Sequence, residues 1–404
     1  MSITRVGTAN MYDSTINNLG SRQSGLVDLM EKTTAGKRVL RASDDPVAAA
    51  QAERARTRIT RSENDQRVLG AQRDVIAQGE SELGKAYGAL QDFRDLVLQA
   101  GNGTYDQIAR DALVQQMQSL REQILGHANA KDSNGLPIFR GLGSPDTPLQ
   151  STPPGSTSLL NAGQSTGSDN GLPVSLDGHA AWLNVPTGNG VFEVASGAAN
   201  AGKAWADAGV VTDPGKVTGD SYTLVFSKDP VSGAISYAIN SSAASANNPV
   251  VAPTPFKDGQ AVVVNGQQIT IKGEPADGDS FTMAPSQRTD IFTVLDQAIA
   301  TVKAGTSAPT ALQQGLGRAL SELDSGMNRV QAVRSYAGDQ LNRADRLDTG
   351  MKDEALTQEG ARSRAEDIDM IKALSDVETQ KVGLQAALQS YAQMQKLSLF
   401  NYIS

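Results

Sequence analysis

Two adjacent carboxylates in the run Ser43-Asp44-Asp45-Pro46 have the residue types for acid/base or metal chemistry. The same four residues also fit the start of a helix. Ser or Asp before a helix accepts hydrogen bonds from its unpaired N–H groups, proline in the first turn needs no donor, and negative charge suits the helix dipole. We therefore interpret Ser43, Asp44, Asp45 and Pro46 as a helix cap.

Few other residues could carry out chemistry. The chain has no cysteine, and His127 and His179 are its two histidines, which argues against thiolate sites and most histidine-based catalysis. The clusters Glu366-Asp367-Ile368-Asp369 and Asp277-Gly278-Asp279 have too few correctly spaced ligands for a calcium loop. The sequence therefore predicts no catalytic residue, no metal and no cofactor, and a protein that is not an enzyme.

Charge is distributed unevenly along the chain. The net charge is -8, and the stretch 141–286 contains twelve Asp or Glu, five Lys and no Arg. The flanks are almost neutral, so no basic stripe for nucleic acid is present. No run approaches the ~18 apolar residues of a membrane span, and the first residues lack the apolar core of a cleaved signal peptide. We expect neither nucleic acid nor membrane as a partner.

The middle of the chain has the composition of a separate β domain. Thirteen of the sixteen prolines lie in 141–286. Segments 190–195, 221–227 and 235–240 are short, β-branched or aromatic, and bounded by turn residues. The run 262–271 contains Asn265-Gly266, the pair preferred in a type I′ hairpin turn.

The flanks are rich in helix-forming residues and contain seven-residue apolar repeats. One helix over 46–100 would be about 80 Å long at ~1.5 Å per residue, too long for a compact globule. The fold class expected is multidomain α plus β: a long antiparallel coiled-coil helical rod built from both flanks, with an inserted all-β outer domain. The predicted rod core consists of Leu69, Ile76, Leu83, Leu90, Val97, Leu320, Leu323, Met327, Val330 and Leu341.

Both ends of the chain contain amphipathic stripes that polar residues interrupt. Burial of five seam side chains recovers ~10 kcal/mol, far less than the roughly 45 kcal/mol of entropy lost on ordering ~30 residues. We expect both ends to be disordered in the monomer and to fold against neighbours; the alternative is that they pair within one molecule. The predicted assembly interface comprises Ile16, Leu19, Leu26, Met30, Leu384, Leu388, Tyr391, Leu397, Leu399 and Phe400.

These patterns predict five parts. They are an N-terminal axial helix at 1–44, disordered until assembled, rod helices at 45–140, the inserted β domain at 141–286, rod helices at 287–360, and a C-terminal axial helix at 361–404.

Four motifs are spread over most of the chain: Thr34–Val39 followed by Ala42–Ala48, Ala128–Gly141, Gly273–Thr282, and Glu366–Asp369 with the ending Lys396–Ile403. This combination resembles the flagellin superfamily, and within it the hook-associated proteins. The resemblance implies a structural adaptor of the bacterial flagellum, secreted through the export apparatus, at the junction between hook-associated protein 1 and the flagellin filament. The implied partners are other copies in a ring, hook-associated protein 1, flagellin, an export chaperone and the export apparatus.

Three alternatives stay open at this point. Flagellin usually has a serine pair and an Asp-Asp-Ala-Ala run where this chain has Thr34-Ala35-Gly36 and Asp44-Asp45-Pro46, so a filament subunit is the runner-up. Hook-associated protein 1 ranks third. A secreted hydrolase or adhesin is the alternative of another class, and the lone His179 and the lack of Arg in 141–286 argue against it.

Overall fold

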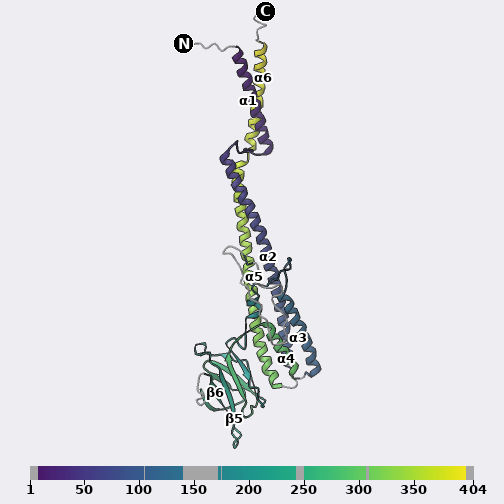
Figure 1. The fold of residues 1–404 in the computed structure, drawn as a ribbon, viewed down its shortest axis with the longest axis vertical. Helices are drawn as coiled ribbons and strands as arrows, with labels where there is room; N and C mark the ends of the chain where they lie inside the picture. Colours follow the sequence, from purple (N-terminus) through teal and green to yellow (C-terminus); the bar gives the residue numbers. More distant parts are fainter. Residues whose placement is uncertain are drawn as a thin grey trace, which may run out of the picture. The chain divides into compact units, whose positions relative to one another are not determined.

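The computed structural model describes residues 8–103, 105–139, 172–173, 175–242, 250–305 and 309–396 (Figure 1). The chain divides into two compact units, one formed by 1–68 with 346–404 and the other by 69–345. The α-helices of the described residues are α1 (Thr8–Ala35), α2 (Pro46–Ala100), α3 (Gln107–Ala128), α4 (Ile291–Ala304), α5 (Pro309–Glu366) and α6 (Met370–Lys396). No helix among these residues has the length and apolarity needed to cross a membrane.

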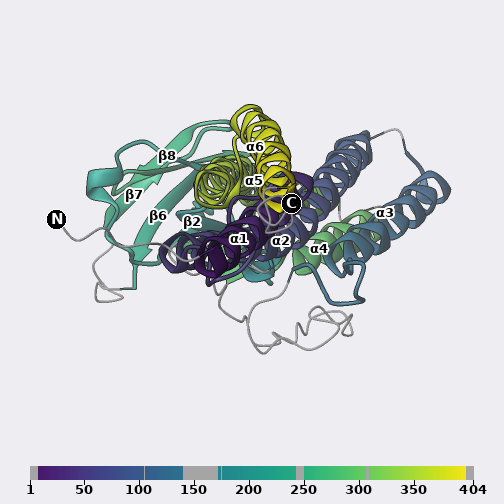
Figure 2. The same ribbon diagram turned by 90° about the horizontal axis from the view of Figure 1, so that it is seen from above.

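In the 69–345 unit, the second half of α2 and the first half of α5 run antiparallel. Arg73 pairs with Asp345 at 3.1 Å and Arg94 pairs with Asp324 at 2.7 Å, so partners fall in number along α5 as they rise along α2. Helices α3 and α4 pack against each other in the same unit (Figure 2). Their contact includes a cation–π pair, with the Arg121 guanidinium 5.9 Å from the ring centre of Phe292.

Most of the predicted rod core is buried in this unit. The buried members are Leu69, Ile76, Leu83, Leu90, Val97, Leu323, Met327 and Val330. Leu320 and Leu341 are only half-buried, which differs from the prediction. Their neighbours Ala319 and Gln340 are buried instead, because α5 turns a slightly different face toward the other helices than a strict seven-residue repeat implies.

The inserted β part is built of short antiparallel strands. They are β1 (Val185–Pro186), β2 (Phe192–Ser196), β3 (Trp205–Ala206), β4 (Val210–Val211), β5 (Tyr222–Lys228), β6 (Ile235–Ser241), β7 (Val251–Pro255), β8 (Ala261–Val264), β9 (Gln267–Lys272), β10 (Ser280–Pro285) and β11 (Arg288–Thr289). A five-stranded sheet has the order β2-β10-β5-β6-β7, β9 pairs with β3, β4 and β8, and β1 pairs with β11. Both larger sheets contribute to one core around Phe226, Ile269 and Phe281.

The predicted hairpin lies between β8 and β9. Asn265 and Gly266 have φ angles of 42° and 76°, as a type I′ turn requires. Contacts with α5 hold this domain beside the helices: Gly188 N donates to the buried Glu322 at 2.9 Å, and Ser321 Oγ donates to Gly188 O at 2.8 Å. The β domain and α5 therefore share a buried polar contact.

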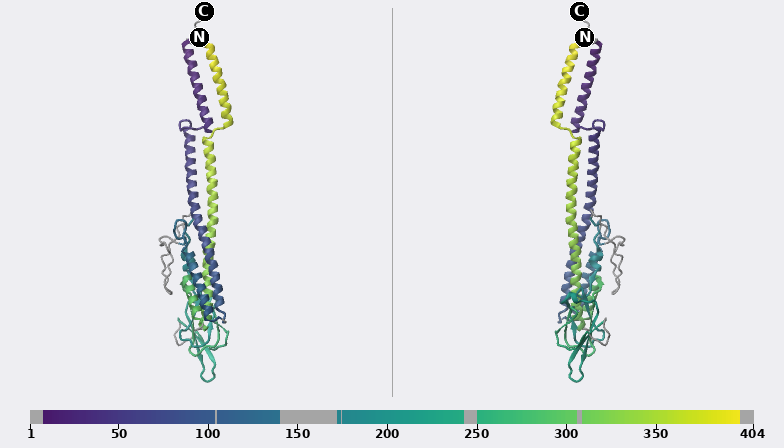
Figure 3. Two further views of the ribbon diagram at one scale, coloured as in Figure 1. Left: turned by 90° about the vertical axis from the view of Figure 1, so that its right-hand side faces the viewer. Right: turned by 90° about the vertical axis from the view of Figure 1, so that its left-hand side faces the viewer.

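In the other unit, α1 and α6 are helical and lie side by side (Figure 3). This is the alternative considered above, in which the ends pair within one molecule, and it differs from the expectation of disordered ends. The physical reason is that α1 and α6 each have an apolar face, and pairing shields part of both faces from water. The pairing is close at Gly25, where a Cβ would lie 3.4 Å from Gln380 Oε1. The break between α5 and α6 falls at 367–369, several residues after the predicted boundary at 360/361.

Candidate functional site

Two of the motifs that are far apart in the sequence meet in one place. Gly36, with φ of 68°, ends α1, and the chain then turns toward α2. On the other side, the chain passes from α5 to α6. Lys37 forms an antiparallel bridge with Asp367, Arg38 N donates to Glu366 O at 2.7 Å, and Ile368 N donates to Gly36 O at 3.1 Å. We call the residues 36–46 and 365–369 the clasp.

Glu366 is the electrostatic centre of the clasp. Its carboxylate is buried and accepts hydrogen bonds from Lys37, from Arg56 at 2.5 and 2.7 Å, and from Arg362 at 3.3 Å. Burial opposes ionisation, but the hydrogen bonds from Lys37 and Arg56 outweigh it and hold the pKa of Glu366 below its usual value. The ionised Glu366 carboxylate, at the end of α5, therefore binds the α1–α2 connection through Lys37 and α2 through Arg56.

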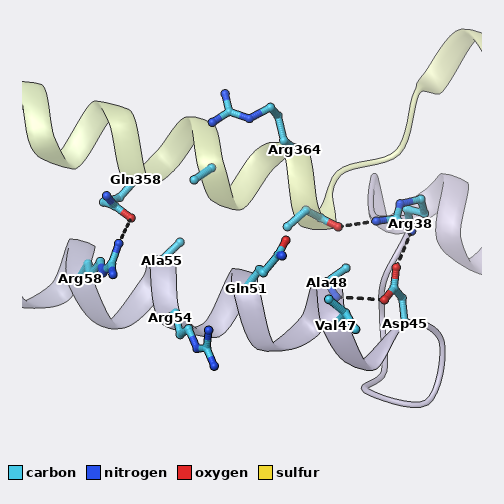
Figure 4. A pocket seen from close by; sticks show the side chains of 12 residues that line it. Arg38, Asp45, Val47, Ala48, Gln51, Arg54, Ala55, Arg58, Gln358 and Arg364 are labelled. Atoms are coloured by element: carbon cyan, nitrogen blue, oxygen red, sulfur yellow. Dashed lines mark hydrogen bonds and ion pairs between the residues drawn. The ribbon is translucent and has the colours of Figure 1, made fainter.

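The predicted helix cap forms the other side of the clasp (Figure 4). Pro46 begins α2, and Asp45 Oδ1 accepts a hydrogen bond from Ala48 N at 3.0 Å. The Ala48 hydrogen bond and then the Arg38 guanidinium, 3.1 Å away, lower the pKa of Asp45. Asp45 thus caps α2 and also holds the Arg38 side chain in place.

Asp44 supports the same turn from inside. Its Oδ2 atom accepts hydrogen bonds from Arg41 N at 3.1 Å and Leu40 N at 3.0 Å, which lower its pKa. Ser43 lies exposed just before it. Arg38 completes the connection by donating to Ala365 O at 2.8 Å. All these groups position the backbone, and none is arranged with a nucleophile or base.

The predicted assembly residues are unevenly covered by the α1–α6 pair. Leu26 is buried, and Leu19, Leu384 and Tyr391 are half-buried. Ile16, Met30 and Leu388 are exposed, with 45% of Ile16 and 47% of Leu388 open to solvent. Leu397, Leu399 and Phe400 lie outside the described residues. The pair therefore leaves part of each apolar row unpartnered.

A second apolar row on α6 was not found from the sequence. Ile371 and Val382 are 85% and 55% exposed. Ile371 and Val382 are eleven residues apart, which is about three helical turns, so they share a face. The signal was present in the sequence, but it lies beside the stronger row through Leu384 and Leu388.

The two histidines and the acidic turn have structural contacts. His127 Nδ1 lies 2.6 Å from Glu82 Oε2 and so joins α3 to α2. Asp177 accepts a hydrogen bond from His179 N at 2.9 Å. Asp279 is buried and accepts from Ala201 N and Ala276 N at 2.8 and 2.7 Å. Among the residues that the structure describes, no group of three or more His, Cys, Asp or Glu could hold a metal ion.

Comparison with known proteins shows similarity to flagellar proteins along nearly the whole chain. Residues 6–144 match the bacterial flagellin N-terminal helical region, a stretch that includes the first half of the clasp. The chain is 25% identical over 402 residues to a protein of Escherichia coli strain K12, "Flagellar hook-associated protein 3", covering 98% of both chains. This chain is similar to flagellar hook-associated protein 3 along nearly its whole length.

A solved structure agrees with that similarity. The flagellar junction protein of Legionella pneumophila superposes with a TM-score of 0.67 at 26% identity, covering 73% of this chain and 99% of that one.

The sequence similarity to a flagellin is shorter. A flagellin of Bacillus subtilis is 32% identical, but over only 136 residues, which are 33% of this chain and 45% of that protein. The similarity to hook-associated protein 3 therefore extends through the middle and C-terminal parts, whereas that to this flagellin covers one third of the chain.

Proposed function

We propose that this protein is the structural adaptor of the bacterial flagellum that joins hook-associated protein 1 to the flagellin filament. The observation that carries the proposal is the full-length similarity to hook-associated protein 3, which includes the inserted β domain that a match to the flagellin helical region alone does not explain. On this proposal, the protein acts outside the cell, in the flagellum, and its role is structural rather than enzymatic.

The contacts of the terminal helices support this role. Exposed apolar residues on α1 and α6 offer surface that a neighbouring subunit can bury, at about 25 cal/mol per Å² of apolar area removed from water. The clasp holds the two terminal helices to the ends of α2 and α5 through the buried Glu366. A load applied to α1 or α6 thus passes to both long helices rather than to one.

The partners belong to the same proposal. Other copies of the chain form a ring, hook-associated protein 1 contacts one end of that ring, and flagellin contacts the other. Before assembly, an export chaperone binds the subunit and the flagellar export apparatus secretes it. Ile16, Leu19, Leu26, Met30, Leu384, Leu388 and Tyr391 are the described residues that we propose for contacts between subunits.

Genetic complementation tests the function. The gene is expressed in its own bacterium after deletion of the chromosomal copy, and filaments on the hooks are counted by electron microscopy. We expect the deletion to leave hooks without filaments and secreted flagellin in the medium, and the restored gene to return filament growth. Normal filaments in the deletion strain would contradict the proposal. Shortened hooks or unstable filaments along their whole length would favour another position in the flagellum.

A further inference from the structure

The inserted β domain is connected to the helical part by two stretches of chain that lie side by side. The chain enters the domain through β1 (Val185–Pro186) and leaves it through β11 (Arg288–Thr289), and these strands pair antiparallel. Thr187 N donates to Gln287 O at 2.9 Å, and Gln287 N donates to Thr187 Oγ1 at 2.9 Å. A ribbon of only two strands is marginally stable by itself, so it holds the domain weakly in place.

The hydrophobic core of the β domain is separate from the helices. Among the described residues, the buried cluster between the sheets consists of side chains from 192–283, and none comes from α5. A long hydrogen bond of 3.5 Å joins Gln314 Nε2 of α5 to Val194 O of β2. The core of the domain therefore does not itself fix the orientation of the domain against α5.

Gly188 is the residue at which the chain turns from the ribbon into the β domain. Its φ is 61°, in the left-handed region, and an added Cβ would collide with Phe192 O, so glycine is required here. The next residue is already held by the domain, because Asn189 Nδ2 donates to Ala208 O and Gly209 O at 3.3 and 3.0 Å. A change in the backbone angles of Gly188 would therefore turn the domain against the ribbon.

Both backbone polar groups of Gly188 are bound by neighbouring side chains of α5. Gly188 N donates to Glu322 Oε1 at 2.9 Å, and Gly188 O accepts from Ser321 Oγ at 2.8 Å. Gly188 is buried, and the Glu322 side chain is only 2% exposed. Loss of the carboxylate would leave a buried N–H group without a partner, which is costly.

Arg318 joins the same carboxylate to the β domain. Its Nε donates to Glu322 Oε1 at 2.8 Å, and its Nη2 donates to Glu193 Oε2 at 3.4 Å. A buried carboxylate needs a charged partner, and this guanidinium supplies it. Arg318, Ser321 and Glu322 lie within about one turn of α5. We call these three side chains together with Gly188 the pivot clamp.

We propose that Gly188 is the pivot of a hinge between the β domain and the helices, and that the pivot clamp keeps this hinge closed. The proposal rests on two observations: the domain has a core of its own, and both polar groups of its pivot residue are bound by α5. While the clamp is intact, the domain moves with α5 as one body. Without the Glu322 carboxylate, the domain turns about Gly188 and about 286–287 in the returning strand. The hinge does not depend on the proposed function.

Spin labels measure the hinge directly. The chain has no cysteine, so cysteines are introduced at two exposed positions of the full-length protein, Val263 on β8 and Gln331 on α5. Double electron–electron resonance between the two labels gives the distribution of distances between the domain and the helix. We expect a narrow distribution in the labelled parent protein and a broad one in Glu322→Ala. Glu322→Gln should fall between them, because its amide oxygen still accepts a hydrogen bond but carries no charge.

Hydrogen exchange shows whether the motion is centred on Gly188. We expect the Gly188 amide to exchange roughly 10- to 100-fold faster in Glu322→Ala, the factor that corresponds to one hydrogen bond to a charged group. The amides of β5 and β10 should keep their wild-type protection, because the core of the domain does not take part in the motion. Faster exchange elsewhere in the ribbon, with an unchanged rate at Gly188, would overturn the assignment of the pivot.

Asp339→Asn is the matched control for Glu322→Gln, because Asp339 is an exposed acid further along α5. It should leave the distance distribution unchanged, and equal broadening in this control would overturn the inference. So would a narrow distribution in folded Glu322→Ala, or a distribution that is already broad in the parent protein. If Glu322→Ala loses the protection of β5 and β10, the domain itself has unfolded, and Ser321→Ala and Glu322→Gln replace it. A narrow distribution in both of these variants would then overturn the inference.

Discussion

Arg56 and Glu366 are 310 residues apart in the sequence, yet the Arg56 guanidinium donates to both carboxylate oxygens of Glu366 at 2.5 and 2.7 Å. This contact joins the first part of α2 to the last residue of α5. Since Lys37 reaches the same carboxylate from the α1–α2 connection, one buried acid connects three segments. The clasp should consequently be more sensitive to Glu366 than to any exposed acid nearby.

Glu366→Gln should destabilise the folded protein by about 1–3 kcal/mol, the range for hydrogen bonds to charged groups, and solvent around the half-exposed Arg56 keeps the loss at the lower end. Urea unfolding of the full chain, followed by circular dichroism, measures the change. Glu359→Gln is the matched control, because Glu359 is exposed and pairs with Arg362 alone. Equal losses in the two variants would mean that the burial of Glu366 has no special role.

The lowered pKa of Glu366 predicts acid sensitivity. Because its folded-state pKa lies below the ordinary 4.5, the folded protein binds fewer protons than the unfolded chain in this range. The stabilisation is complete above pH 4.5 and is lost as the pH falls through the folded-state value. Unfolding free energies of wild type and Glu366→Gln between about pH 7 and 3 should therefore converge at the acid end. A constant difference across that range would contradict the assignment.

Local sequence patterns predicted the parts whose determinants are close together in the chain. The cap at Asp45 and Pro46 depends on backbone donors two or three residues away, and the turn at Asn265-Gly266 depends on the conformations of those two residues. The repeat through Leu83 and Leu90 likewise shows which face of α2 is apolar. Each of these signals can be found within a dozen residues.

The clasp could not be predicted in the same way. Nothing near Lys37 or Arg56 in the sequence specifies that their acidic partner is Glu366, since any exposed Glu or Asp has the same local signal. From the sequence, the cluster at 366–369 shows only that it has too few ligands for a calcium loop. In the structure Glu366 ends α5 and is buried, and Asp369 accepts hydrogen bonds from Ile371 N and Lys372 N at the start of α6. The pairing of α1 with α6 could not be predicted either. Their interrupted apolar rows indicate that each helix needs a partner, but not whether that partner belongs to the same molecule or to another.

Leu83→Ala and Leu90→Ala should each lower the stability of the 69–345 unit by about 2–5 kcal/mol, because both side chains are fully buried and their truncation leaves a cavity. Leu98→Ala is the control, since Leu98 lies on the same helix with 48% of its surface exposed. Differential scanning calorimetry compares the three variants. The seven-residue repeat of α2 would not be a core if all three had the same transition as wild type.

Leu388→Asp should prevent assembly while leaving the monomer nearly as stable as wild type. Leu388 is about half exposed in the α1–α6 pair, so a carboxylate there remains hydrated in the free subunit. At a subunit contact, the same carboxylate would be buried without a partner and would cost several kcal/mol. We expect secreted subunit, few filaments, and flagellin in the medium. Gln389→Asp, on an exposed neighbouring position, is the control and should support normal filament growth. A monomer of Leu388→Asp that melts much earlier than wild type would assign Leu388 to an intramolecular core, and normal filaments would remove it from the assembly interface.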